Sequence, residues 1–143
     1  MEHANDPTAP AGVKEVRIAF DLSTGDGKTL LNFLDVIDEM RQSLIKEGVK
    51  PQLVLALRGP ATRLVQTNLT QIKPEDHESA AKIAEKVNGL RTAEGVDSIE
   101  QCGVAMRRLG IKPQDVIPGI HVVGNSWISL SVYQAKGYAY IAP

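Results

Sequence analysis

The chain has 143 residues, of which 43% are hydrophobic and 23% are charged, and such values are typical of one globular domain. Its 16 Lys and Arg residues against 17 Asp and Glu give a net charge of −1, which argues against phosphate-based nucleic-acid binding and against an anionic membrane surface. No apolar run reaches the roughly 18 residues that a membrane-spanning helix needs. We therefore expect neither nucleic acid nor membrane as a partner.

The N-terminal residues 1–13 are polar, carry Pro7 and Pro10, and lack the basic start and apolar stretch of a secretory signal. We expect a flexible arm over 1–13, one α/β domain over 14–143, and a cytoplasmic location. Export of a mature form whose signal has been removed stays an alternative.

The first sixty residues predict a strand, a helix and a second strand. Val16–Phe20 alternates apolar and polar residues briefly before it becomes apolar, and the turn-rich segment Asp21–Gly27 follows it. From Lys28 to Glu47 apolar residues recur three and four positions apart, and Gly48 follows where a helix would end. Gln52–Leu57 is almost continuously apolar, as expected of a strand buried on both faces of a parallel sheet.

The rest of the chain continues the alternation of helices and strands. The expected elements are a short helix over Ala61–Gln66, a long helix from Lys73 to Gly89, a strand over Val96–Gln101, a helix over Gly103–Leu109, a strand over Ile120–Gly124, a helix over Trp127–Ala135 capped by Ser126, and a strand over Tyr138–Ile141. This alternation predicts a three-layer α/β/α domain with a central, mainly parallel sheet of about five strands.

A glycine-containing loop, Gly25-Asp26-Gly27-Lys28, lies between the first strand and the first helix, where a phosphate-binding loop would lie. The full nucleotide-binding pattern requires a glycine at position 22, which is Leu22 in this chain. We therefore keep two interpretations. The loop holds a small anion, or Asp26 interacts with the positive end of the helix.

Cys102 is the only cysteine, which excludes an intramolecular disulfide and a multi-cysteine metal site. It is expected between a strand and a helix, at the carboxyl edge of the sheet, where open α/β folds place their sites. Backbone N–H groups at the helix start, with Arg107 and Arg108, would lower the pKa of the thiol and make it a nucleophile. Free cysteines are also commonly buried and inert, so both interpretations remain open.

The three histidines are scattered and none has a partner at metal-ligand spacing, so we expect no metal and no cofactor. His121 lies in an expected strand and has either a structural role or a place near Cys102. The aromatic residues near the C-terminus, such as Trp127 and Tyr140, are typical of core or subunit contacts.

Several segments of the C-terminal half carry a family resemblance. They are Gln101-Cys102-Gly103, Leu109-Gly110-Ile111, Asp115 to Val123, and Tyr133-Gln134-Ala135-Lys136-Gly137-Tyr138-Ala139-Tyr140-Ile141-Ala142-Pro143. They resemble the DsrE/DsrF-like family, which includes the YchN-like proteins. The N-terminal half agrees through Leu30 to Leu34 and the turn Arg58-Gly59-Pro60-Ala61, so the resemblance covers about Lys14 to Pro143.

The resemblance implies a compact α/β domain that assembles into trimers or hexamers, and a cysteine that carries sulfane sulfur as a persulfide. Cys102 matches that cysteine. The expected function is sulfur relay, as a sulfurtransferase or persulfide carrier with donor and acceptor proteins as partners, and Arg107, Arg108 and His121 are candidate helpers. The alternative is a non-catalytic oligomeric binding or scaffold subunit for a small anion or a protein partner, and nucleotide binding is a third candidate.

Overall fold

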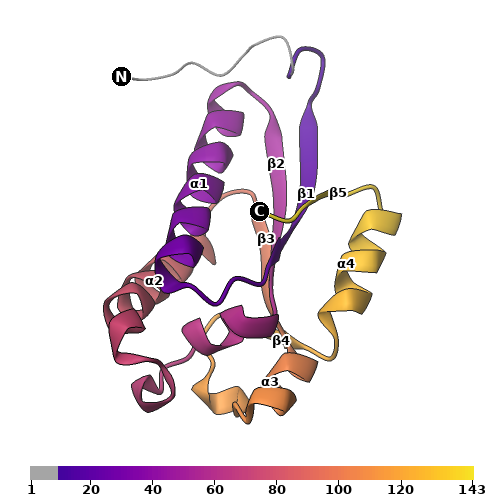
Figure 1. Ribbon diagram of the computed structural model, residues 1–143. Helices are drawn as coiled ribbons and strands as arrows, with labels where there is room; N and C mark the ends of the chain where they lie inside the picture. The colour runs from indigo at the N-terminus through magenta and orange to yellow at the C-terminus, as the bar shows by residue number, and fades with distance from the viewer. Residues whose placement is uncertain (1–9) are drawn as a thin grey trace.

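Five strands form the central sheet of the protein (Figure 1). The computed structural model describes residues 10–143, so positions 1–9 of the predicted arm lie outside the described residues. The strands are β1 (Glu15–Leu22), β2 (Lys50–Leu57), β3 (Val96–Cys102), β4 (His121–Val123) and β5 (Ala139–Ile141). They are arranged in the order β4-β3-β2-β1-β5 and each neighbouring pair is parallel, which confirms the predicted sheet.

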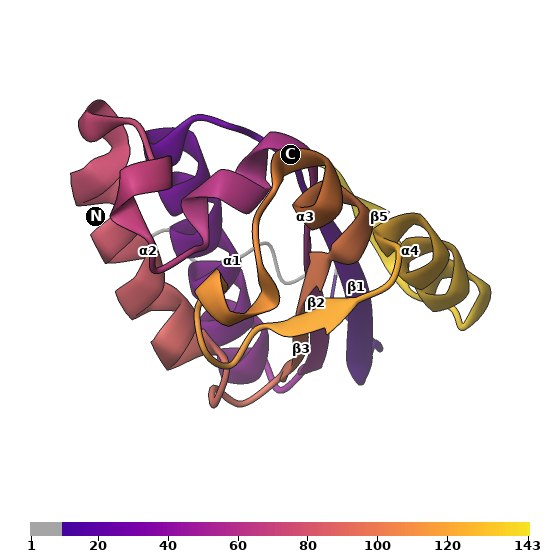
Figure 2. The same cartoon turned by 90° about the horizontal axis from the view of Figure 1, so that it is seen from below.

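Helices cover both faces of this sheet. They are α1 (Gly27–Lys46), α2 (His77–Leu90), α3 (Gly103–Leu109) and α4 (Ser126–Ala135). Figures 1 and 2 show α1 and α2 together on one face, α4 on the other, and α3 at the end of the sheet where the strands finish. The predicted three-layer α/β/α architecture is therefore confirmed.

The main core lies between the sheet and the layer of α1 and α2. Successive side chains of a strand point to opposite faces, so Leu53, Leu55 and Leu57 of β2 face this layer and are fully buried. Val54 and Ala56 point to the opposite face and are buried as well. Each buried leucine of this kind contributes about 1.5–3 kcal/mol. The central position of β2 thus explains its nearly unbroken apolar sequence.

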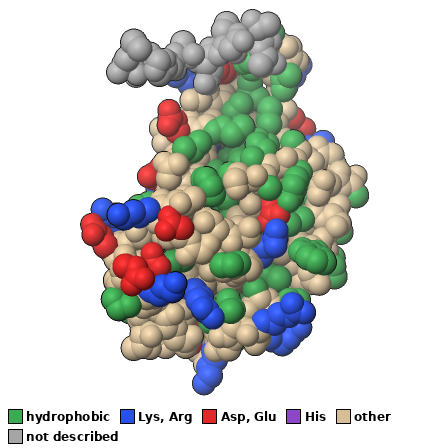
Figure 3. Space-filling view, in the orientation of Figure 1, with side chains coloured by type: hydrophobic (Ala, Val, Ile, Leu, Met, Phe, Trp, Pro, Cys, Tyr) green, Lys and Arg blue, Asp and Glu red, His purple; other side chains and the backbone are tan. Residues whose placement is uncertain are grey.

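The opposite face of the sheet is covered less completely. Ala19 and Ala56 pack against Leu130 of α4, and such small side chains let the helix lie close to the sheet. The outer side of α4 is apolar and exposed, with Trp127 at 70% and Ile128 at 64% of full exposure. In Figure 3, hydrophobic side chains gather over the upper and right-hand part of the visible face, whereas most Lys and Arg side chains lie in its lower half.

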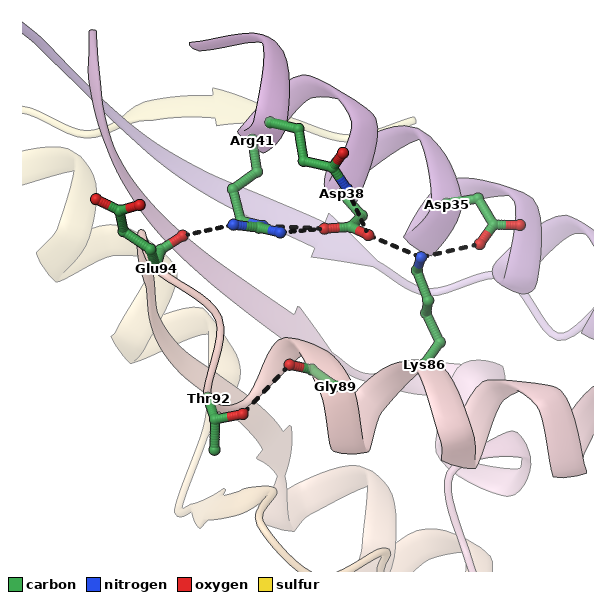
Figure 4. A network of polar contacts seen from close by, with 8 residues as sticks. Asp35, Asp38, Arg41, Lys86, Gly89, Thr92 and Glu94 are labelled. Atoms are coloured by element: carbon green, nitrogen blue, oxygen red, sulfur yellow. Dashed lines mark hydrogen bonds and ion pairs between the residues drawn. The ribbon is translucent and has the colours of Figure 1, made fainter. Parts of the chain in front are cut away.

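A polar network joins α1 to α2 and to the loop that precedes β3 (Figure 4). Lys86 Nζ of α2 lies 2.8 Å from Asp38 Oδ2 and 3.5 Å from Asp35 Oδ1 of α1. Arg41 Nη2 lies 2.8 Å from Asp38 Oδ1, and its Nη1 donates to the carbonyl of Glu94 at 3.1 Å. Burial raises the pKa of Asp38, but the bonds from Lys86 and Arg41 bring it below the ordinary value. Asp38 thus joins the two helices as an ionised carboxylate.

Three helices predicted beyond the second strand start at other residues in the structure. The short helix expected over Ala61–Gln66 is a 3-10 helix over Gly59–Leu64. The long second helix does not begin at Lys73, because Pro74–Asp76 forms a separate 3-10 turn and α2 starts at His77. The cap of α4 is Asn125 rather than Ser126, because Asn125 has the extended backbone of a cap and its side-chain oxygen accepts from Trp127 N at 2.9 Å. Ser126 is thus the first helical residue.

Within residues 10–143, no helix combines the length and the apolar character that crossing a bilayer requires. Over the same residues, no group of three or more His, Cys, Asp and Glu side chains is arranged to hold a metal ion.

Candidate functional site

Cys102 is the last residue of β3 and the cap residue of α3. Its side chain lies on the face of the sheet that α4 covers, and the residue is only 5% exposed. The next residue must be a glycine, because a Cβ atom at Gly103 would lie 2.7 Å from the carbonyl oxygen of Val123. This close approach brings the end of β4 and the start of α4 against the cysteine.

The sulfur of Cys102 is surrounded by hydrogen-bond donors. Ser126 N, the first amide of α4, donates to Sγ at 3.4 Å, and it is free to do so because the first amides of a helix have no acceptor within it. Burial raises the pKa of the thiol, but the backbone N–H groups of Ser126, Ala105 and Val104 lower it more. The pKa of Cys102 is therefore below its ordinary value, which increases the thiolate fraction at neutral pH.

A pocket of about 290 Å³ opens at Cys102. It lies at the carboxyl edge of the sheet, between the ends of β2 and β3 and the starts of α3 and α4. Its lining residues are Arg58, Gly59, Cys102, Val104, Ala105, Arg108, Asn125 and Trp127. Two guanidinium groups and one thiol thus share a small cavity, and this combination favours an anionic occupant.

Arg58 is held in this pocket by a carboxylate of the neighbouring strand. Its Nε donates to Asp21 Oδ1 at 2.6 Å and its Nη2 donates to Asp21 Oδ2 at 3.0 Å. The hydroxyl of Tyr140 in β5 also donates to Asp21 Oδ2. Burial raises the pKa of Asp21, but the bonds from Arg58 and Tyr140 bring it below the ordinary value. Asp21 is thus an ionised, 4% exposed carboxylate that fixes Arg58.

The structure brings only one of the three predicted helper residues to Cys102. Arg108 lines the pocket, whereas Arg107 does not, because successive residues of a helix project about 100° apart. His121 is exposed and lies at the start of β4, where it pairs with Glu100. The residue of β4 that pairs with Cys102 is Val123. His121 therefore lies two residues, or ~6.6 Å along the strand, from the residue next to Cys102.

The loop Gly25-Asp26-Gly27-Lys28 lies apart from the Cys102 pocket. Gly25 borders a second cavity of about 190 Å³, whose other lining residues are Pro60, Arg63, Leu64, Gln71, Ile72, Lys73 and Asp76. Asp26 caps α1, since its Oδ2 accepts from Thr29 N at 3.0 Å and from Thr29 Oγ1 at 2.6 Å. A Cβ atom at Gly27 would lie 2.9 Å from a carboxylate oxygen of Asp76. An anion at this helix start would therefore meet two carboxylates.

The pocket also contains polar and aromatic residues that were not among the predicted site residues, namely Arg58, Asn125 and Trp127. The signal that singled out Cys102 also applies to two of them, because Arg58 directly follows β2 and Asn125 lies two residues after β4. Carboxyl ends of parallel strands meet at one edge of a sheet, so polar residues just after two strands are expected to converge there. Trp127 has no such signal, since it reaches the pocket only through the position of α4.

No family model matches the chain. A relative from Aquifex aeolicus (strain VF5), described as an uncharacterized protein, is 27% identical over 126 residues, which are 88% of this chain and 55% of the relative. The chain thus spans about half the length of the curated relative it matches.

Two solved structures share the fold. The protein of unknown function MTH1491 from Methanobacterium thermoautotrophicum superposes with a TM-score of 0.67 at 19% identity, covering 90% of this chain and 99% of the other. The ychN protein from E. coli superposes with a TM-score of 0.59 at 18% identity, covering 92% and 99%. The chain is therefore an α/β protein with a cysteine at the carboxyl edge of its sheet. More particularly, it has the YchN-like fold.

Proposed function

We propose that this protein belongs to the DsrE/DsrF-like family and carries sulfane sulfur as a persulfide on Cys102. The observation that carries the proposal is the position of the Sγ atom, which accepts an amide hydrogen bond and shares a pocket with Arg58 and Arg108. The resemblance of Gln101-Cys102-Gly103 and of the C-terminal segment to that family supports the same conclusion.

In the loading step, the thiolate of Cys102 attacks the outer sulfur of a donor persulfide or polysulfide. A new S–S bond forms, the donor's S–S bond breaks, and the donor leaves as a thiolate with the electron pair of that bond. The exchange is redox-neutral and consumes no cofactor. The product is a persulfide anion on Cys102, and the positive charges of Arg58 and Arg108 stabilise it in the pocket.

In the unloading step, an acceptor thiolate attacks the outer sulfur of the persulfide and Cys102 leaves as a thiolate. A thiol with a lowered pKa is a better leaving group, so the amides that face Sγ favour release as well as loading. One cysteine is sufficient for both steps. The donor therefore presents a persulfide or polysulfide at the pocket, and the acceptor presents a thiol there.

The test is intact-mass analysis after incubation with inorganic polysulfide, with and without a reductant. We expect wild-type protein to gain a sulfur atom that the reductant removes. Cys102→Ser should gain none, because the chain has no other cysteine. The proposal is wrong if wild type gains no sulfur, or if Cys102→Ser gains as much.

One observation favours the second candidate, a non-catalytic oligomeric binding or scaffold subunit. Trp127 lines the pocket and is also 70% exposed, so an apolar surface continues from the pocket onto α4. Alkylation of the native protein separates the two candidates. A thiol that resists iodoacetamide until the protein unfolds would favour the scaffold function.

A further inference from the structure

We infer that Tyr140 and Asp21 are positioning residues that hold the free edge of the Arg58 guanidinium toward the Cys102 thiolate. The inference rests on the proposed function, because it concerns how that site accommodates the negative charge of the thiolate and its persulfide. Tyr140 lies in β5, at the edge of the sheet, and does not line the pocket itself.

The hydrogen bonds of Arg58 define which of its donors are free. A guanidinium has five N–H donors in a fixed plane. Asp21 takes one from Nε and one from Nη2, in a two-point contact that fixes both the position and the tilt of the group. No hydrogen bond joins Nη1 to residues in the described part of the chain. Since Arg58 lines the pocket, this free edge is available to an anion there.

Tyr140 acts on Arg58 through Asp21. Its hydroxyl donates to Asp21 Oδ2, the same oxygen that accepts from Arg58 Nη2. This bond fixes the orientation of the carboxylate and takes up part of its negative charge. Less of that charge is then available to cancel the positive charge of Arg58. Loss of the hydroxyl should therefore loosen Arg58 and reduce the positive potential at Cys102.

If Tyr140 and Asp21 had a purely structural role, they would hold β5, β1 and β2 together and would not affect the thiolate of Cys102. To separate the two roles, we compare alkylation by iodoacetate with alkylation by iodoacetamide, which react with the same thiolate but differ in charge. The thiolate fraction cancels when the rate constant for iodoacetate is divided by the rate constant for iodoacetamide at the same pH. The ratio therefore reports the positive potential near Sγ, and stability alone does not move it.

The expected result is a graded fall in this ratio. Arg58→Gln should lower the ratio about fivefold, because it removes the positive charge itself. Tyr140→Phe should lower it about twofold, because it changes only how firmly Arg58 is held. The matched control is Tyr138→Phe, whose hydroxyl lies 3.5 Å from Asp97 and has no contact with Arg58. Its ratio should equal that of wild type. Tyr140 is 45% exposed, so Tyr140→Phe removes little packing.

Three results would overturn the inference. The alkylation ratio of Tyr140→Phe could equal that of Tyr138→Phe, or the ratio of Arg58→Gln could equal that of wild type. The third such result is that neither reagent alkylates the wild-type thiol. Failure of the proposed function is a separate result. In that case polysulfide adds no sulfur to wild type while the order of the alkylation ratios still holds.

Discussion

Asp21 and Arg58 form a two-point ion pair, with N–O distances of 2.6 and 3.0 Å, where the neighbouring strands β1 and β2 end. The carboxylate is almost fully buried, whereas the arginine side chain is 29% exposed and reaches the pocket of Cys102. The parallel register of the two strands, in which Leu22 pairs with Leu57, places the two residues at the same edge. The ion pair thus connects a buried carboxylate of the sheet to a guanidinium group that lines the candidate site.

Removal of the Asp21 charge should destabilise the protein most at neutral pH. The folded-state pKa of Asp21 lies below its unfolded value of ~3.9, so the charged form adds stability above that value. This contribution is lost as the pH falls through the folded pKa. We expect Asp21→Asn to cost about 1–2 kcal/mol at pH 7, a reduced figure because Arg58 is partly exposed, and less in acid.

Urea unfolding at pH 7 and near pH 3 measures this difference. The control is Asp35→Asn, at a carboxylate whose side chain is 57% exposed, and it should change stability little at either pH. The electrostatic explanation would be contradicted if Asp21→Asn lowered the free energy of unfolding by the same amount at both pH values.

Alanine at position 103 should strain the junction between β3 and α3. The added Cβ would lie 2.7 Å from the carbonyl oxygen of Val123, so backbone must move. The gain in helix propensity, up to ~1 kcal/mol, offsets only part of this cost, and we expect Gly103→Ala to lose about 1–3 kcal/mol. Gly124→Ala is the matched control, because a Cβ there meets nothing within 4 Å. Equal melting temperatures for the two variants would refute the steric argument.

Lys86 should stabilise the contact of α1 with α2 more than Lys82 stabilises α2 alone. Lys86 is 29% exposed and reaches the 16% exposed Asp38, whereas Lys82 pairs with Glu78, whose side chain is 83% exposed. We expect Lys86→Gln to cost about 1 kcal/mol and Lys82→Gln less than about 0.5 kcal/mol. Chemical unfolding at low and at 1 M salt tests this, and the loss for Lys86→Gln should shrink in salt. Similar losses in both variants would argue against a special role of Asp38.

The apolar outer face of α4 should support self-association, as the family resemblance also implies. Ile128 and Val132 are 64% and 44% exposed, and no residue of α4 carries a charge. We expect light scattering at micromolar concentration to give a mass of several chains, and Ile128→Glu to reduce it. Val36→Glu, at a 53% exposed apolar position of α1, is the control and should leave the mass unchanged. A wild-type mass of one chain would refute this prediction.

Much of the fold could be predicted because its elements are encoded locally. The helical spacing of apolar residues placed α1 within one residue of its ends, and the helix predicted over Gly103–Leu109 has those bounds in the structure. The start of α2 was less predictable, since Pro74 suits the first turn of either a 3-10 or an α-helix. The choice between Asn125 and Ser126 as cap depends on backbone angles that either residue type accepts.

The sequence by itself determined the succession of strands and helices along the chain, the parallel character of the sheet, and the place of Cys102 at the carboxyl edge of the sheet. Each of these follows from residue periodicity and from turn residues close together in the chain. Only the tertiary structure decided which charged groups meet the thiol. Asp21 and Tyr140 are 119 residues apart, and Arg108 rather than Arg107 faces the pocket. Such contacts depend on strand register and helix rotation, which arise only when distant segments pack together.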